Sequence, residues 1–385
     1  MIDPNFMPTL DPNPLPAPYW IFKLLLVLTF FLHILAMNFM MGGAVLALAA
    51  KWRSKNRDQG KRIFVDLSKK MPVLLPATIT LGIAPLLFLQ VLYGQFFYAS
   101  SIVMAWPWFL VLAFLTIAYY GFYYVSFHSG QDSGKAGTVM LFSVILVFLI
   151  GFIYGNNLTL SQTPTRWRAK YFANPSGWNL NSSEPTLIPR FLHFFVAAIA
   201  VGGLLLVFLA LAKWKQDREY ARGLLQFGGK AFMFATMAQF LVGIWFLATL
   251  PRDLRMLFLG DNPLATILLV VGVVGGIAAI FLMSDALRKE NVRVAAYYVS
   301  VIVAVVIASM SIMRDILRDA YLKPYYRPDQ FAVKTQWSVF PLFLALFVGG
   351  VILWFVMLAR YGLFGGAKAA QPVQEEAPEL TGAAR

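Results

Sequence analysis

The 385-residue sequence contains no cysteine. The chain therefore forms no disulfide, and it offers no thiolate for an iron–sulfur cluster, a thiolate-ligated haem or a covalently attached c-type haem. Charged residues are also scarce, at 13% of the chain against 59% hydrophobic residues. The hydrophobic residues occur in repeated runs long enough to cross a bilayer, which predicts a polytopic membrane protein in contact with lipid.

Acidic residues are outnumbered by basic ones, and the formal net charge is +14. We expect no nucleic-acid partner, because Lys and Arg lie in short loops between apolar segments, as the positive-inside rule describes. The loop 51–70 has eight basic and two acidic residues, which predicts a cytoplasmic location for it. Alternation along the chain then predicts an outside N-terminus and a cytoplasmic C-terminus in a bacterial-type inner membrane. Residues 1–19 are Pro-rich and acidic and lack the basic region of a signal peptide, so we expect the first helix to be uncleaved.

Nine apolar segments have the roughly 20 residues that a bilayer core about 30 Å thick requires. They predict an all-α integral membrane protein with spans at 20–50, 72–99, 104–128, 137–160, 188–212, 229–250, 263–287, 292–313 and 337–360. The expected organisation is an extracytoplasmic segment (1–19), a four-helix bundle (20–160), an outer loop (161–187), a second four-helix bundle (188–318), an outer loop (319–336), a ninth helix (337–362) and a disordered cytoplasmic tail (363–385).

A short repeat links the two predicted bundles. "FLHILAMNFMMGG" (31–43) and "FLHFFVAAIAVGG" (191–203) match at five of thirteen positions, and both helices end in "AKW". Both helices are predicted to start outside, so a true repeat is parallel, with its axis along the membrane normal. Matches among apolar residues also arise from helix composition alone, and the sequence leaves both readings open.

The repeat contains two of the three histidines, His33 and His193. At about 1.5 Å per helical residue they lie about 27 and 30 Å from the basic helix ends, in the outer part of the membrane. A histidine there is costly unless its ring finds partners. One reading is an axial ligand to haem iron, and the other is a hydrogen bond to a neighbouring helix. His128, at the cytoplasmic end of the third span, is expected to be interfacial.

Residues near the two histidines can likewise be interpreted in two ways, as cofactor-binding or as packing residues. Gly43 and Gly203 follow them by ten residues, and glycine permits close approach either of a macrocycle or of another helix. Met310 and Met313 are predicted at the depth of His193, where one of them could complete a His/Met haem site or simply fill space. Arg314 and Arg318 follow them, and they could pair with haem propionates or with the acids beside them, Asp315 and Asp319.

Ionisable residues are nearly absent from the centres of the predicted spans. A secondary transporter is expected to carry intramembrane Asp or Glu as an ion relay, but the closest candidates, Asp285 and Asp315, lie at predicted helix ends. Electron transfer through a buried cofactor needs no such relay. This pattern favours a redox function over transport.

Four stretches in order resemble subunit I of the cytochrome bd quinol oxidases. They are "LLLVLTFFLHILAMNFMMGGAVLALA" (24–49), "MPVLLPATITLGIAPLLFLQVLYGQFFYASS" (71–101), "IGFIYGNNLTLSQTPTRW" (150–167) and "PRFLHFFVAAIAVGG" (189–203). The resemblance covers roughly residues 20–210 and beyond that is mainly a helix count of nine. It implies that His33 ligates one of two closely spaced haems and that His193 ligates the low-spin haem. It assigns a ligand methionine only loosely to Met310 or Met313.

The sequence also departs from that family where oxygen is reduced. The third span (104–127) has no acidic residue, the quinol loop shrinks to "PRDLRMLFLGDNP" (251–263), and no glutamate lies in the eighth span. Oxygen reduction consumes protons, which a bundle without protonatable groups delivers poorly. We therefore expect the haem subunit of a quinol-linked oxidoreductase complex.

This expectation specifies cofactors and partners. The chain would carry one or two b-type haems, exchange electrons with a membrane quinone, and deliver them to or receive them from a c-type cytochrome or other outer-side subunit in a hetero-oligomer. The outer basic residues Arg314, Arg318, Lys323 and Arg327 could hold propionates or dock an acidic partner. The alternatives are a cytochrome bd-type terminal oxidase subunit and a haem-free transporter or structural membrane subunit.

Overall fold

The computed structural model describes residues 13–53, 57–131, 133–288 and 292–361, and its regular structure is helical. Nine of the described helices are long and apolar enough to cross a membrane, which confirms the expected all-α membrane fold. The spans are α1 (Tyr19–Arg53), α3 (Met71–Val103), α4 (Ala105–His128), α5 (Ser133–Ser161), α7 (Leu187–Lys213), α8 (Arg218–Thr249), α10 (Pro263–Arg288), α11 (Val292–Leu322) and α12 (Val339–Tyr361). Short helices are α2 (Arg57–Ser68), α6 (Trp167–Ala173) and α9 (Arg252–Met256).

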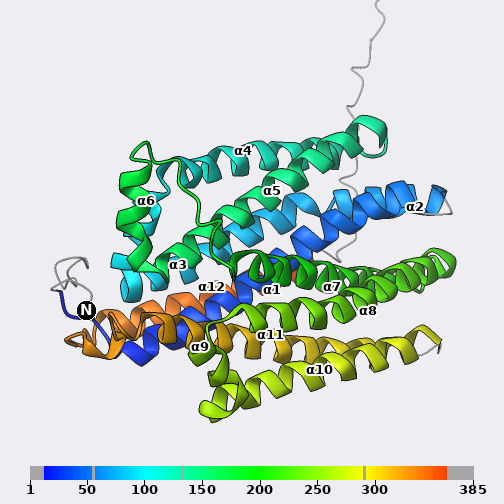
Figure 1. Ribbon diagram of the computed structural model, residues 1–385. Helices are drawn as coiled ribbons and strands as arrows, with labels where there is room; N and C mark the ends of the chain where they lie inside the picture. Colours follow the sequence, from blue (N-terminus) through cyan, green and yellow to red (C-terminus); the bar gives the residue numbers. More distant parts are fainter. Residues whose placement is uncertain (1–12, 54–56, 132, 289–291, 362–385) are drawn as a thin grey trace, which may run out of the picture. The chain divides into compact units, whose positions relative to one another are not determined.

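The chain divides into two compact units, Met1–Phe340 and Pro341–Arg385. The first contains the spans α1 to α11, which run roughly side by side in Figure 1. The second consists, in its described part, of most of α12, a highly apolar helix. The tail predicted at 363–385 lies outside the described residues, as do the first twelve residues of the N-terminal segment.

Two helix boundaries differ from the sequence prediction. The span predicted to end at 313 continues as α11 to Leu322, because "RDILRDAYL" has no Gly or Pro and the first proline follows at Pro324. Arg314 and Arg318 therefore lie in a helix, not in an outer loop. Helix α8 begins at Arg218, eleven residues before the predicted 229, because the Asp217 side chain accepts a hydrogen bond from the Tyr220 backbone N–H and caps the helix.

The two repeated helices cross each other directly. A Cβ atom built on Gly202 of α7 would lie 2.4 Å from the carbonyl carbon of Gly42 in α1. These glycines occupy the same place in the repeat, the twelfth residue of each thirteen-residue stretch. Contact between equivalent residues is what a parallel two-fold axis through this crossing would produce. The structure thus favours a genuine repeat over coincidence of composition.

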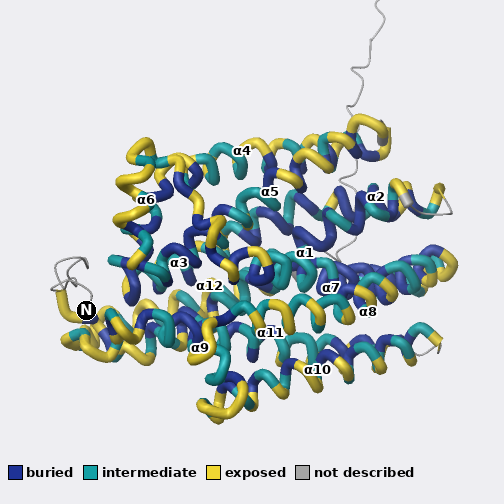
Figure 2. The backbone as a smooth tube through the Cα atoms, viewed as in Figure 1, coloured by how far each residue is buried: buried dark blue, intermediate teal, exposed yellow. Residues whose placement is uncertain are grey.

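Burial separates these central helices from peripheral ones. In the most hydropathic part of α7, 61% of the residues are buried, against 17% in α4 and 22% in α10. Figure 2 shows the same contrast along the backbone of the first unit. Exposed apolar residues of α4 and α10, such as Phe109 and Phe281, have the character of a lipid-facing surface.

The two ends of the first unit are built differently. At the end called here the α6 end, α6 is fixed by the Trp167 indole N–H, which donates to the Leu160 carbonyl. At the same end, the backbone of Leu15 forms hydrogen bonds with Ala332 and Lys334 and ties the N-terminal segment to the connection after α11. The opposite end, called the α2 end, carries the amphipathic helix α2 and the turn between α7 and α8 (Figure 1).

Candidate functional site

His33 is held by the neighbouring span α3. Its Nδ1 lies 3.0 Å from the carbonyl oxygen of Thr78. A carbonyl only accepts, so Nδ1 carries the proton and Nε2 keeps its lone pair. This tautomer is the one that presents Nε2 as a metal ligand while the other ring nitrogen is anchored. The ring packs on Gly82, where a built Cβ would come within 2.9 Å of Nδ1 and Cε1.

His193 has a similar setting between α7 and α8. A Cβ built on Gly243 would lie 3.4 Å from its Cε1 atom. The Gln239 side-chain amide donates to the His193 backbone carbonyl at 2.8 Å. The buried Nδ1 of the His193 ring has no hydrogen-bond partner among the described residues. The imidazole therefore has a nitrogen that the described protein leaves unused.

The two histidine sites share a pattern that spans two helices. In each, one residue of the partner helix bonds to the histidine, through its ring or its backbone, and a glycine four residues later faces the ring: Thr78 and Gly82 in α3, Gln239 and Gly243 in α8. Residues four apart lie on one helix face. The similarity of the two halves thus extends into helices where the sequence showed no repeat.

An arginine with a buried Nε atom accompanies each histidine. Arg314 of α11 places its guanidinium 4.1 Å from the ring centroid of Phe30, one helical turn from His33. Arg190 lies one turn before His193 and places its guanidinium 5.2 Å from the ring centroid of Phe246, which in turn neighbours the His193 ring. Each cation thus lies over an aromatic ring beside a histidine.

These two guanidinium groups are incompletely paired. Arg190 is 6% exposed and donates through Nη1 to the Gln162 amide oxygen at 2.8 Å. The Nε of Arg190 and the Nε of Arg314 are buried without a hydrogen-bond partner in the described chain. A buried cation is costly unless an anion and hydrogen bonds compensate it. Each of these arginines thus keeps at least one buried N–H donor that the described residues leave unused.

Arg318 belongs to a separate ionic network at the α6 end. Its Nη1 lies 3.1 Å from Asp315, and the Lys23 ammonium lies 2.5 Å from both Asp315 and Asp319. The Tyr93 hydroxyl donates to Asp319. The alternative in which arginine pairs with a neighbouring acid is confirmed for Arg318. Sequence reasoning missed Lys23 and Tyr93, because they lie on α1 and α3, far from α11 along the chain.

The predicted outer basic cluster does not form one surface. Arg318 is 3% exposed and Arg314 also lies inside the bundle, so neither can dock a partner. Arg327 is exposed and forms an ion pair with Asp329. The hydrogen bond from Arg327 lowers the pKa of the Asp329 carboxyl. Helical continuation of α11 explains the difference, because it carries the two arginines inward.

The two methionines and the two repeat glycines, Gly43 and Gly203, lie in different surroundings. Met313 packs against the buried cluster of Leu250, Phe258, Ala265 and Leu317, against which Phe246, the ring next to His193, also packs. Met310 packs on α10, where a Cβ built on Gly272 would lie 2.6 Å from its Cε. Gly43 and Gly203 lie at helix–helix contacts, Gly43 against Leu205 and Gly203 against the Gly228 carbonyl, and close packing accounts for both.

His128 lies apart from the other two histidines, at the α2 end. Its Nδ1 is 2.9 Å from the carbonyl of Tyr124, one turn back in α4, and its ring stacks on that tyrosine at 4.2 Å. This position agrees with an interfacial side chain. It makes His128 a natural control for experiments on His33 and His193.

Comparison with known proteins adds no relative. No protein-family model matches the chain, and no curated protein matches it. The geometry of the two histidine sites therefore carries the functional argument.

Proposed function

We propose that the chain is a b-type haem subunit of a quinol-linked oxidoreductase in a bacterial-type inner membrane. It exchanges electrons between membrane quinone and a redox partner at the α6 end, such as a c-type cytochrome. The observation that carries the proposal is the paired arrangement of His33 and His193, each over a glycine and each beside a buried arginine. The resemblance of residues 20–210 to cytochrome bd subunit I points the same way.

The residues present fit a haem at each histidine. Thr78 fixes the His33 proton on Nδ1 and leaves Nε2 for iron, and His193 has an unused buried nitrogen. Arg314 and Arg190 would compensate haem propionates, since both have buried donors without partners. Met313 is the better-placed candidate for a second ligand near His193, because it packs on the same buried cluster as Phe246, whose ring neighbours His193. Bound haem would supply reversible one-electron chemistry.

The ionic network favours electron transfer over oxygen reduction. The acids nearest to the site, Asp315 and Asp319, already have the cations Lys23 and Arg318 as partners. Both carboxylates are thus held in ion pairs with side chains of α1 and α11. The proposed electron transfer needs no proton relay through these acids.

A reduced minus oxidised spectrum of the purified protein tests the proposal. We expect a b-type α band and two haems per chain by pyridine haemochrome. His33→Ala and His193→Ala should each remove one different haem, whereas His128→Ala should retain both. A spectrum without a b-type band would overturn the redox function. Loss of the same single haem in either variant would instead show one haem bound between the two histidines.

Oxygen consumption separates the proposal from the oxidase alternative. Purified protein with added quinol should reduce an outer-side electron acceptor without consuming oxygen. Sustained oxygen uptake that disappears in His33→Ala would identify a terminal oxidase subunit.

A further inference from the structure

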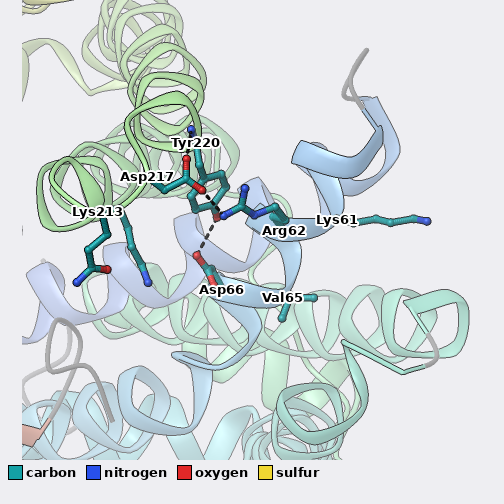
Figure 3. Close-up of a pocket in the computed structure, with 8 residues that line it drawn as sticks. Lys61, Arg62, Val65, Asp66, Lys213, Asp217 and Tyr220 are labelled. Carbon is teal, nitrogen blue, oxygen red and sulfur yellow. Dashed lines mark hydrogen bonds and ion pairs between the residues drawn. The ribbon is translucent and has the colours of Figure 1, made fainter. Parts of the chain in front are cut away.

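A pocket of about 380 Å³ opens at the α2 end, far along the helices from the histidine sites. One wall comes from α2, with Lys61, Arg62, Val65 and Asp66, and the other from the α7–α8 turn and the first turn of α8, with Lys213, Gln216, Asp217 and Tyr220 (Figure 3). No residue of this pocket belongs to the proposed haem sites.

The two walls are joined by fixed contacts. The Arg62 guanidinium donates to Asp217 at 2.7 Å and lies 4.0 Å from the Tyr220 ring centroid. The Tyr220 hydroxyl donates to Asp66 at 2.8 Å. Both acids of the pocket are thus engaged by the walls themselves. A preformed pocket loses little conformational entropy when a ligand binds.

The remaining charges of the pocket are positive. Lys61 and Lys213 form no ion pair among the described residues, and the Lys61 side chain extends away from the Arg62–Asp217 pair in Figure 3. Lys70 lies nearby. Burial lowers the pKa of Lys70, the charge of Lys213 lowers it further, and Asp66 opposes both effects. An anionic group that binds here meets the unpaired Lys213 ammonium, and the Lys61 ammonium adds positive charge at the outer edge of the α2 wall.

The pocket lies at the level where the spans end. Lys213 is the last residue of α7, and α8 begins at Arg218. Trp214 sits between them, with the Arg218 guanidinium 6.0 Å from its ring centroid. Exposed Trp52 lies at the end of α1. Trp together with Lys and Arg marks the membrane–water interface, so the pocket faces the headgroup layer.

We propose that this pocket binds the phosphate-bearing headgroup of an anionic phospholipid from the adjacent leaflet. Basic pockets between spanning helices at the headgroup level provide the charge for such lipids. Lys213 contacts the phosphate, Lys61 adds positive charge at the outer edge of the α2 wall, and the Arg62–Asp217–Tyr220–Asp66 contacts hold the two walls at a fixed spacing. The lipid joins α2 to the α7–α8 turn and so stabilises the α2 end.

Native mass spectrometry of the whole purified protein tests this site. Phosphatidylglycerol, phosphatidylcholine and inorganic phosphate are titrated separately against wild type and the double variant K61Q/K213Q. The matched control is K215Q/K334Q, which removes the same charge from two exposed lysines outside the pocket. We expect phosphatidylglycerol binding to weaken at least about tenfold in K61Q/K213Q and to stay unchanged in the control.

The outcomes separate the possible ligands. Equal binding of phosphatidylglycerol and phosphatidylcholine, or unchanged binding in K61Q/K213Q, would overturn the proposal. Displacement of the lipid by inorganic phosphate would show that the pocket takes soluble phosphate and would equally overturn it. Should the double variant fail to fold, the single variant K61Q should still weaken phosphatidylglycerol binding severalfold, because this exposed side chain has no structural contact to lose.

Discussion

At the scale of single residues, the hydrogen bond between His33 Nδ1 and the Thr78 carbonyl determines which ring nitrogen of His33 carries the proton. A histidine inside an apolar helix is compatible with several roles until its tautomer is known. The carbonyl fixes that tautomer, and the glycine at position 82 leaves the ring its space. The tautomer of His33 and the space for its ring therefore depend on Thr78 and Gly82 of α3, neither of which has reactive side-chain chemistry.

The variant Gly82→Ala tests this close approach. Its Cβ would lie 2.9 Å from the His33 ring, so we expect the ring to shift and the protein to lose about 1–3 kcal/mol of unfolding free energy. Gly155→Ala in α5 is the control, because its Cβ would meet Leu187 at an ordinary 3.5 Å. Unfolding in mixed micelles measures both. Equal stability of the two variants would show that the His33 ring is not confined by α3.

Substitutions at Lys23 and Arg327 compare the stability contributed by a partly buried ion pair with that of an exposed one. The Lys23 side chain is 16% exposed, and Lys23→Met would leave Asp315 and Asp319 facing each other. We expect a loss of about 2 kcal/mol, less than for a fully buried pair because Asp319 is 39% exposed. Arg327→Met removes an exposed pair and should change the unfolding midpoint little. The prediction fails if both variants unfold at the wild-type midpoint.

At the scale of helices, the crossing of α1 and α7 organises the first unit. Gly42 and Gly202 bring two backbones into contact, and in a membrane close packing of small residues drives association where hydrophobicity cannot. The two histidines lie nine residues from this crossing, on helices that it holds together. A substitution that disturbs this contact is therefore expected to affect both proposed haem sites.

Gly202→Ala should disrupt that crossing. The new Cβ would lie 2.4 Å from a backbone carbon of Gly42, which has no side chain to move aside. We expect a destabilisation of about 3 kcal/mol or more, together with weaker haem retention at both histidines. Gly151→Ala in α5 meets only Phe191 at 3.5 Å and serves as control. Haem content and unfolding midpoint, measured on the same preparations, should fall together in Gly202→Ala alone.

The docking of α2 has a pH dependence that can be predicted from Asp217. The hydrogen bond from Arg62, followed by that from the Tyr220 backbone, lowers the pKa of the Asp217 carboxyl below its ordinary value of 3.8. A lowered folded pKa gives stability that is fully present above pH 3.8 and is lost as the pH falls through the folded pKa. Acid below this window should therefore loosen α2 from the α7–α8 turn.

Asp217→Asn measures this contribution. The stability difference between wild type and the variant should be constant from pH 7 to pH 5 and should shrink below pH 3.8. In an Arg62→Gln background the same substitution should have a smaller effect, because the main cause of the pKa shift is gone. A difference that persists unchanged at pH 3 would contradict the role of this pair.

At the scale of the whole molecule, the nine candidate spans among the described residues predict that the two termini lie on opposite sides of the membrane. The basic α2 end, with the turns 129–131 and 214–217, is predicted to face the cytoplasm. A fluorescent protein that folds only in the cytoplasm should fluoresce after fusion to the C-terminus or at Gly130. Fusion at Trp178, in the connection between α6 and α7, should remain dark. The reverse pattern would show the opposite orientation and would place the histidine sites near the cytoplasm.

The sequence by itself determined the class, the spans and the two repeated histidines, because hydropathy and length decide locally whether a segment enters a bilayer. It also indicated glycine crossings, without telling packing from cofactor binding. Only the tertiary structure decided that Gly42 meets Gly202, that Thr78 fixes the tautomer of His33, and that Arg190 and Arg314 lie over aromatic rings beside the histidines. These contacts join residues far apart in the chain, and their energy depends on how the helices pack. Helix packing cannot be deduced from the local properties of any one segment.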